Sequence, residues 1–262
     1  MKAFIMAAGA GTRLIRVSQN QPKCLLNMGG RPLVTRMLDL LEARGITDVT
    51  VITGFQADLV RKEVGARARL VHNPFYHVTN SIASLWFARD RLEGDALFAN
   101  ADLFFEPALL DPLLHSPRER LMLCDTTRIA DADYRFTLLG DRLVGYGKDI
   151  PIEQTSAEYV GMAKVAAAFM PAFRQRLEAM IDAQQAGCWW EDVLYSFIPE
   201  GRHVWTHDVK GTFWGEVDYV EDYDRIVAWV NAHRKAGEPP CPRAVELLGP
   251  DSAPGAAPLA VS

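Results

Sequence analysis

The chain has 262 residues, of which 49% are hydrophobic and 23% are charged, a composition typical of a globular protein with a sizeable core. Its formal net charge is -5 and its basic residues are spread along the chain, which argues against nucleic acid as a partner. No apolar run approaches the roughly 20 residues of a membrane-spanning helix. The four cysteines lie far apart, without the spacing of a zinc or redox site. We therefore expect a cytoplasmic protein with no membrane insertion, and the oligomeric state, a homodimer included, stays open.

Strands and helices are expected to alternate through the first half of the chain. Residues 2–8 predict an apolar strand that ends in a glycine-rich loop, which is how a buried parallel strand opens an α/β fold. Residues 31–44 have the apolar spacing of a helix, and Gly45 stands at the C-cap position. The elements expected next are strand 48–53, helix 56–64, strand 68–72, helix 81–91 and strand 96–101. This order predicts an open, mostly parallel sheet with helices on both faces and a ligand site at the carboxyl ends of the strands.

After residue 121 the pattern changes to short segments of alternating polarity. Residues 134–139 and 142–146 predict a hairpin that turns at Gly140 and Asp141. Helices are expected over residues 171–186 and 220–236. Residues 237–262 are rich in Pro, Gly and Ala and lack periodicity, which predicts a mobile tail.

The first chemical motif is the loop in residues 6–14. Gly9 and Gly11 allow backbone amides to approach phosphate oxygens, and Arg13 and Lys23 can neutralise the charge of those oxygens. The loop is not a Walker loop, and it lacks the third glycine of a dinucleotide-binding motif. A tight strand-to-helix turn would explain the two glycines alone. The two added cations favour a triphosphate site.

Acidic residues form the second motif. Asp102 ends an apolar stretch, where a helix N-cap would be the alternative explanation. Glu216 and Asp218 alternate along a short strand and therefore lie on one side of it. Two carboxylates, completed by triphosphate oxygens and waters, suit Mg²⁺, which rarely takes a cage made only of protein ligands.

These motifs together resemble the nucleotidyltransferase superfamily, and the similarity extends over most of residues 1–235. The resemblance implies a Rossmann-like nucleotidyltransferase domain over residues 1–236. Its nucleotide-binding half would span 1–120, and its acceptor-binding half, 121–236, would carry a small β-rich insertion. The resemblance also implies catalytic roles for Arg13, Lys23, Asp102 and Asp218, with Mg²⁺ held by Asp102 and Asp218. The nucleotide-binding positions it implies are Ala7, Ala8, Gly9, Gly11, Thr12, Arg13, Lys23, Asn80, Ser84 and Ala101.

Three stretches, residues 80–85, 158–161 and 189–194, resemble the phosphocholine and 2-aminoethylphosphonate cytidylyltransferases. Asn80 and Ser84 lie one helical turn apart and could read a pyrimidine, although capping by Asn80 and packing by Ser84 explain them equally well. The tryptophans and carboxylates of residues 189–192 could bind an ammonium, while core packing would explain at least one tryptophan. Asp192 is preferred over Glu191 as the ammonium partner. The expected acceptor-binding residues are Lys148, Tyr159, Trp190, Glu191, Asp192 and Glu216.

The sequence thus predicts a cytidylyltransferase that uses CTP and a small amine-bearing phosphate or phosphonate. CMP would move to the acceptor and pyrophosphate would leave. One alternative is a sugar-1-phosphate nucleotidyltransferase that uses UTP, GTP or dTTP. A second is a non-catalytic regulator that binds a nucleotide on the same fold.

Overall fold

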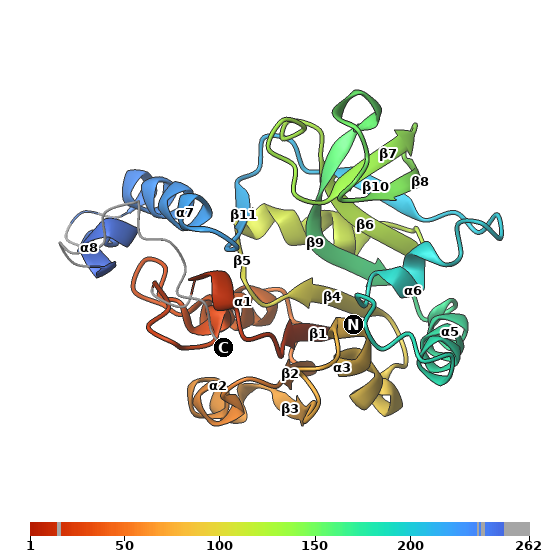
Figure 1. Cartoon of the computed structure of the whole chain (residues 1–262), viewed down its shortest axis with the longest axis horizontal. Coiled ribbons are helices and arrows are strands. Elements are labelled where there is room, and N and C mark those ends of the chain that lie inside the picture. The colour runs from red at the N-terminus through yellow and green to blue at the C-terminus, as the bar shows by residue number, and fades with distance from the viewer. Residues whose placement is uncertain (15–16, 235, 237–238, 249–262) are drawn as a thin grey trace, which may run out of the picture.

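The computed structural model of the chain describes residues 1–14, 17–234, 236 and 239–248 (Figure 1). The strands are β1 (Lys2–Ala7), β2 (Val49–Thr53), β3 (Arg69–His72), β4 (Ala96–Asn100), β5 (Leu103–Phe105), β6 (Arg120–Asp125), β7 (Arg135–Leu139), β8 (Arg142–Gly147), β9 (Ala157–Val165), β10 (Trp205–Asp208) and β11 (Trp214–Glu216). The α-helices are α1 (Leu33–Glu42), α2 (Ala57–Val64), α3 (Ser81–Phe87), α4 (Asp111–His115), α5 (Met170–Asp182), α6 (Asp192–Tyr195), α7 (Val220–His233) and α8 (Ala244–Leu248). None of the described helices is long and apolar enough to cross a lipid bilayer.

The central sheet has nine strands in the order β3-β2-β1-β4-β9-β6-β10-β8-β7. The strands from β3 to β4 are mutually parallel. β9 then runs antiparallel between β4 and β6, and β10 pairs in parallel with β6. The β7–β8 hairpin joins antiparallel to β9 and β10. The sheet of this α/β fold is therefore mixed, which corrects the expectation of a mostly parallel sheet.

The sheet is mixed because of the antiparallel strand β9, which the sequence did not predict and whose residues are all buried. A strand buried on both faces lacks the alternation of polar and apolar residues that reveals a half-exposed strand. Because β9 pairs with β7 as well as with β4 and β6, the hairpin extends the main sheet. The hairpin strands of the acceptor-binding half thus continue that sheet. The hairpin itself is confirmed, with its turn at Gly140 and Asp141.

Helices cover both faces of the sheet, as expected. In β1, Ala3 and Ile5 pack into an apolar cluster with residues of α1 and α2. Phe4 belongs to a second cluster with residues of α3 and α5. Successive strand residues point to opposite faces, so this single strand contributes to both cores.

The C-terminal segment 239–248 packs against α7, in contrast to the mobile tail expected over residues 237–262. Cys241 is buried, and its backbone exchanges two hydrogen bonds with the side chain of Asn231. The hydroxyl of Tyr223 also donates to a carbonyl of this segment. Residues 239–248 therefore make specific contacts with α7, and the other positions of the tail, 237–238 and 249–262, lie outside the described residues.

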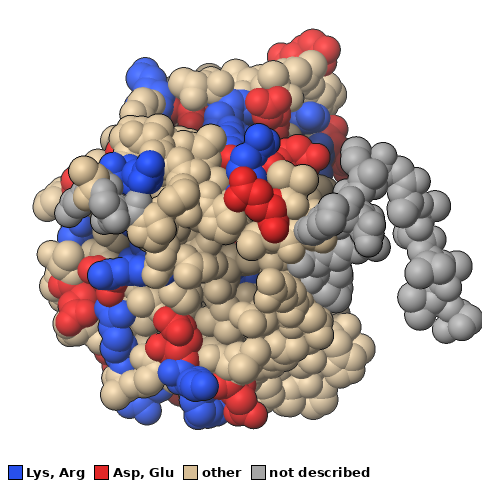
Figure 2. Space-filling model, turned by 90° about the vertical axis from the view of Figure 1, so that its left-hand side faces the viewer, with Lys and Arg blue, Asp and Glu red and all other residues tan. Residues whose placement is uncertain are grey.

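Acidic and basic side chains are interspersed over the face shown in Figure 2. No extended area of one sign is visible among the described residues on that face. A nucleic-acid backbone would therefore find no continuous basic surface there.

Candidate active site

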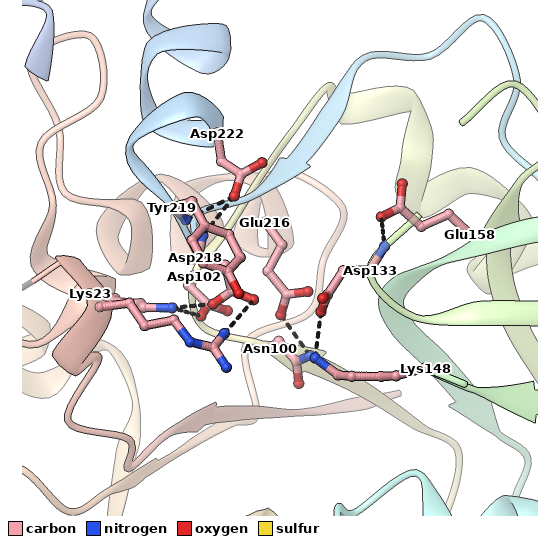
Figure 3. A network of polar contacts seen from close by, with 11 residues as sticks. Lys23, Asn100, Asp102, Asp133, Lys148, Glu158, Glu216, Asp218, Tyr219 and Asp222 are labelled. Atoms are coloured by element: carbon pink, nitrogen blue, oxygen red, sulfur yellow. Dashed lines mark hydrogen bonds and ion pairs between the residues drawn. The ribbon is translucent and has the colours of Figure 1, made fainter. Parts of the chain in front are cut away.

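A small two-stranded sheet brings Asp102 and Asp218 together at the carboxyl end of β4. β5 pairs antiparallel with β11, with Leu103 opposite Glu216. The N–H of Val217 donates to the carbonyl oxygen of Asp102 at 3.0 Å. The two aspartates flank this pairing, so segments far apart in the sequence deliver their carboxylates to one place (Figure 3).

Asp218 is held by its neighbours at the start of α7. A carboxylate oxygen of Asp222 accepts hydrogen bonds from the N–H groups of Asp218 at 3.2 Å and Tyr219 at 2.9 Å. Arg13 reaches the same aspartate from the loop after β1, with Nη1 3.9 Å from Oδ2. Its guanidinium lies 5.1 Å from the centre of the Tyr219 ring. The predicted arginine therefore faces the predicted metal ligand.

Lys23 places its ammonium between the two carboxylates (Figure 3). The nitrogen lies 3.4 Å from Oδ2 of Asp102 and donates a hydrogen bond to Oδ1 of Asp218. The structure thus brings Arg13, Lys23, Asp102 and Asp218 into one cluster, as the sequence predicted.

Gly11 allows this placement of Lys23. Its φ of +59° lies in the left-handed region, and a Cβ at this position would stand 2.5 Å from Cγ of Lys23. No other amino acid fits both the backbone conformation and the space. The glycine loop therefore accommodates the side chain of Lys23 against its backbone.

The carboxyl groups of Asp102, Glu216 and Asp218 crowd together beside the Lys23 ammonium. Burial raises the pKa of Asp102, which the Lys23 ammonium opposes and the Asp218 carboxylate reinforces. Burial, and then the charges of Asp102 and Asp218, raise the pKa of Glu216 well above its ordinary value. Burial disfavours the Lys23 ammonium, but the two aspartates outweigh it and its pKa is raised. Such a site favours an additional cation.

A pocket of about 230 Å³ extends from this cluster along the β1 loop and α3. Arg13 is half-exposed at the edge of the cluster, and the side chain of Thr12 lies outside what the structure describes. The predicted nucleotide-binding residues that line the pocket are Ala7, Ala8, Gly9, Gly11, Lys23, Asn80, Ser84 and Ala101.

Asn80 and Ser84 have structural roles and also face this pocket. The side-chain oxygen of Asn80 accepts from the N–H of Ser81 at 2.8 Å and caps α3. The hydroxyl of Ser84 accepts from Nδ2 of buried Asn73 at 2.9 Å. The capping and packing interpretations are thus confirmed, while reading of a pyrimidine stays a prediction.

A second pocket of about 110 Å³ adjoins the first, on the side of β8 and β9. Lys148 points into this region and pairs with Asp133, with Nζ 2.7 Å from Oδ2 (Figure 3). The Lys148 ammonium also lies 5.9 Å from the centre of the Trp189 ring. The predicted acceptor-binding residues that line this pocket are Lys148, Tyr159, Glu191 and Glu216.

Trp190 was expected to bind the acceptor, but it is 0% exposed and stacks on Phe98 at 5.4 Å. Its Nε1 donates to Oδ1 of Asn100 at 3.0 Å, and Nδ2 of Asn100 donates to Oε1 of Glu216 at 3.0 Å. The exposed tryptophan is Trp189, which lines both pockets. Trp190 is therefore a core residue whose hydrogen bond positions Asn100, and Asn100 lines both pockets.

Asp192 was preferred over Glu191 as the ammonium partner, but it is Glu191 that lies along the pockets. A carboxylate oxygen of Asp192 accepts from the N–H of Trp189 at 2.8 Å, at the start of α6. Glu191 lines both pockets, whereas Asp192 belongs to neither lining within the described part of the chain. Burial raises the pKa of Glu191 to about 8.

Several pocket residues had no signal of their own in the sequence. Asn100 could have been noticed, because it ends the strand that delivers Asp102. The aromatic residues of the second pocket come from different elements, and only the fold brings them together. The residues of the second pocket that the sequence did not single out are Asn100, Asp133, Tyr134 and Tyr195.

Asp102 and Asp218 could hold a divalent cation, because both carboxylates face one point that the Lys23 ammonium now approaches. Oxygen donors suit a hard cation such as Mg²⁺. No cluster of three or more potential metal-ligating side chains occurs among the described residues. Oxygen atoms from a substrate or from water would have to complete the coordination.

Comparison with known proteins gives a family match over most of the chain. The profile of the MobA-like NTP transferase domain matches residues 3–189. The CMP-5'-(3-aminopropyl)phosphonate synthase of Streptomyces rubellomurinus is 29% identical over 83% of this chain. The match spans only 37% of that longer protein.

Two further similarities involve proteins of comparable length. The choline-phosphate cytidylyltransferase of Streptococcus pneumoniae is 25% identical, with 86% of this chain and 96% of that protein covered. Among solved structures, the inositol-1-phosphate CTP transferase from T. maritima has a TM-score of 0.75 at 19% identity. The superposition covers 90% of this chain and 96% of that structure, and it shows the shared fold.

Proposed function

Because the chain belongs to the MobA-like NTP transferase family, we propose that it transfers CMP from CTP to a small amine-bearing phosphate or phosphonate. The acceptor would be of the phosphocholine or 2-aminoethylphosphonate type, and pyrophosphate would be released. The names of the similar proteins support CTP as donor and a zwitterionic acceptor.

The observation that carries the proposal is the junction of the two pockets at the carboxylate cluster. Asp102 lines the larger pocket and Asp218 the smaller one. The linings also share Asn100, Trp189, Glu191 and Glu216. A nucleotide in one pocket and an acceptor in the other would thus present their phosphates to each other beside Lys23.

The proposed reaction needs alignment and charge neutralisation more than a protein nucleophile. An acceptor oxygen would form a bond to the α-phosphorus of CTP while the bond to the pyrophosphate oxygen breaks. A phosphate monoester has a second pKa of about 6 and is largely dianionic at neutral pH, so a general base would add little. Lys23 and Arg13 would stabilise the charge that develops on the leaving pyrophosphate.

We assign Asp102 and Asp218 as ligands of Mg²⁺, since they supply oxygen donors that face one point. When bound, the metal would neutralise charge on the reacting phosphates. Asn80 and Ser84 would face the cytosine, and the backbone of residues 7–11 would face the triphosphate. Glu191 and Glu216 line the second pocket, and an ammonium bound there would favour their ionised forms and pair with them.

One substrate screen tests the proposal. Pyrophosphate release is measured with CTP, UTP, GTP and dTTP, each combined with amine-bearing phosphates, aminoalkylphosphonates and sugar 1-phosphates in the presence of Mg²⁺. We expect the highest kcat/KM for CTP with an amine-bearing acceptor. Preference for a sugar 1-phosphate with another nucleotide would replace the proposal by the sugar-nucleotide alternative. Binding of CTP without turnover on the whole panel would indicate a non-catalytic regulator.

A further inference from the structure

Two tyrosine hydroxyls in the second pocket lack a protein partner. Tyr159 is 6% exposed and Tyr195 is 1% exposed, and both line this pocket. Neither hydroxyl makes a hydrogen bond within the described part of the chain. Burial, and then the charge of nearby Glu191, raise the pKa of Tyr159, yet its hydroxyl makes no hydrogen bond of normal geometry to a described residue. A buried polar atom without a partner is unfavourable, and a hydroxyl both donates and accepts, so these two atoms indicate a ligand that forms hydrogen bonds.

The faces of these two rings are covered by other aromatic rings. Phe136 stacks on Tyr159 with 5.3 Å between ring centres. Tyr146 stacks on Tyr195 at 4.1 Å, with the ring planes 15° apart. The two tyrosines therefore offer the pocket their hydroxyls more than their π faces. Binding of a quaternary ammonium by aromatic rings requires open faces.

Trp189 is the more open aromatic residue of this pocket, with 41% exposure. Its ring already lies 5.9 Å from the Lys148 ammonium, and the edge of Tyr134 meets it at 90°. Lys148 is also paired with Asp133. Asp218 pairs with Lys23, so Glu191 and Glu216 are the described acidic groups of the lining that are left to balance an incoming cation.

We propose that the acceptor pocket selects a primary ammonium over a trimethylammonium through the hydroxyls of Tyr159 and Tyr195. The inference rests on the proposed cytidylyltransferase function and names its acceptor class. The acceptor would be a phosphate ester or a phosphonate whose chain ends in –NH₃⁺. A primary ammonium has three N–H donors, enough for both hydroxyl oxygens and the Glu191 carboxylate. A trimethylammonium has none and would bury the two hydroxyls without partners.

The test compares acceptors that differ only in N-methylation. Initial rates of pyrophosphate release are measured with CTP, Mg²⁺ and phosphoethanolamine, its N-methyl and N,N-dimethyl derivatives, or phosphocholine. We expect kcat/KM to fall with each methyl group and to be at least about tenfold lower for phosphocholine than for phosphoethanolamine, because a site that hydrogen-bonds N–H groups rejects analogues without them. Equal or higher kcat/KM for phosphocholine would overturn the inference. Absence of turnover with all four acceptors would instead refute the proposed function, and the selectivity with it.

Two conservative variants test whether the hydroxyls of Tyr159 and Tyr195 cause this selectivity. Tyr159→Phe and Tyr195→Phe should lower kcat/KM for phosphoethanolamine and leave that for phosphocholine within about twofold. Their melting temperatures should stay equal or rise, since each variant removes a buried hydroxyl that lacks a partner. Tyr146→Phe is the matched control, because Tyr146 is not among the described lining residues, and neither acceptor should respond. Equal losses for both acceptors in the tyrosine variants would show a merely structural role and would refute the inference.

Discussion

The ammonium of Lys23 donates a hydrogen bond to the carboxylate of Asp218, a residue 195 positions further along the chain. The lysine belongs to the loop that follows the first strand, and the aspartate belongs to the last segment before α7. Their contact closes the cluster at which the two pockets meet. Both residues are only partly buried, so substrate or metal can reach them without unfolding of the surrounding structure.

Replacement of Lys23 should impair catalysis more than folding. Lys23→Ala should lower kcat by about 100-fold or more, because it removes a cation preorganised for the leaving pyrophosphate. The measurement is pyrophosphate release under saturating CTP and acceptor, together with a thermal melt. Lys62→Ala, on the exposed face of α2, is the control and should leave both unchanged. Near-normal turnover of Lys23→Ala would remove this residue from the mechanism.

The metal assignment predicts that Asp102→Asn separates activity from stability. The rate should fall by about 100-fold or more and should need a higher Mg²⁺ concentration, since a carboxylate ligand is lost. Burial raises the pKa of Asp102, so a neutral side chain of the same shape should keep or increase the free energy of unfolding at neutral pH. Asp58→Asn, whose side chain is fully exposed, serves as control. An unchanged rate and Mg²⁺ requirement would contradict the assignment.

A pair of glycine variants distinguishes backbone strain from a steric clash. Gly11 and Gly140 have similar φ values of +59° and +63°, but only Gly11 has a neighbour, Lys23, in the way of a Cβ. Alanine should cost about 1–2 kcal/mol at either position because of the left-handed backbone. Gly11→Ala should in addition displace Lys23 and lose activity, whereas Gly140→Ala should retain it. Chemical unfolding and initial rates measure the two effects, and full activity of Gly11→Ala would contradict the role of the close contact.

The adjacent tryptophans should respond in opposite ways to truncation. Trp190→Ala should lower the free energy of unfolding by about 3–5 kcal/mol, as expected for a large side chain lost from the core. Trp189→Ala should have a much smaller effect on stability but should raise KM for the acceptor, because Trp189 lines both pockets. Urea unfolding and acceptor titrations test the pair. Comparable destabilisation by both variants would contradict the assigned positions.

The raised pKa of Glu191 predicts a pH-dependent stability in the ligand-free protein. Its pKa is about 8 in the folded chain, against about 4.3 in an unfolded one. Between these values the folded state binds more protons, so stability falls as pH rises through this interval and levels off above it. The free energy of unfolding of Glu191→Gln, measured relative to that of the parent, should therefore be higher at pH 8 than at pH 5. The gain should be at most a few kcal/mol, because one pKa unit corresponds to about 1.4 kcal/mol.

Urea unfolding at the two pH values measures this effect. Glu153→Gln, on an exposed turn, is the control and should show no pH-dependent gain. A constant difference between Glu191→Gln and the parent across this range would contradict the raised pKa.

Local patterns in the sequence were sufficient for the first half of the fold and for the glycine loop around Gly11 with the cation at Lys23. Asp102 has a weaker local signal, and its proposed role came from the resemblance to the nucleotidyltransferase superfamily. The turn at Gly140 was also correctly placed. Side-chain periodicity and turn chemistry act over short distances, so a linear reading detects them.

Which residues line the second pocket is determined by the tertiary structure. Trp189 and Trp190 are adjacent in the chain, and only the packing of Trp190 on Phe98 determines which of them faces the pocket. β9 is buried throughout and carries no alternation, so its antiparallel insertion between β4 and β6 left no periodic signal. Tyr159 and Tyr195 meet in one pocket because that strand and α6 are packed together. The residues proposed to act on the phosphates are thus marked by motifs in the sequence, whereas the composition of the second pocket depends on long-range packing that no local pattern records.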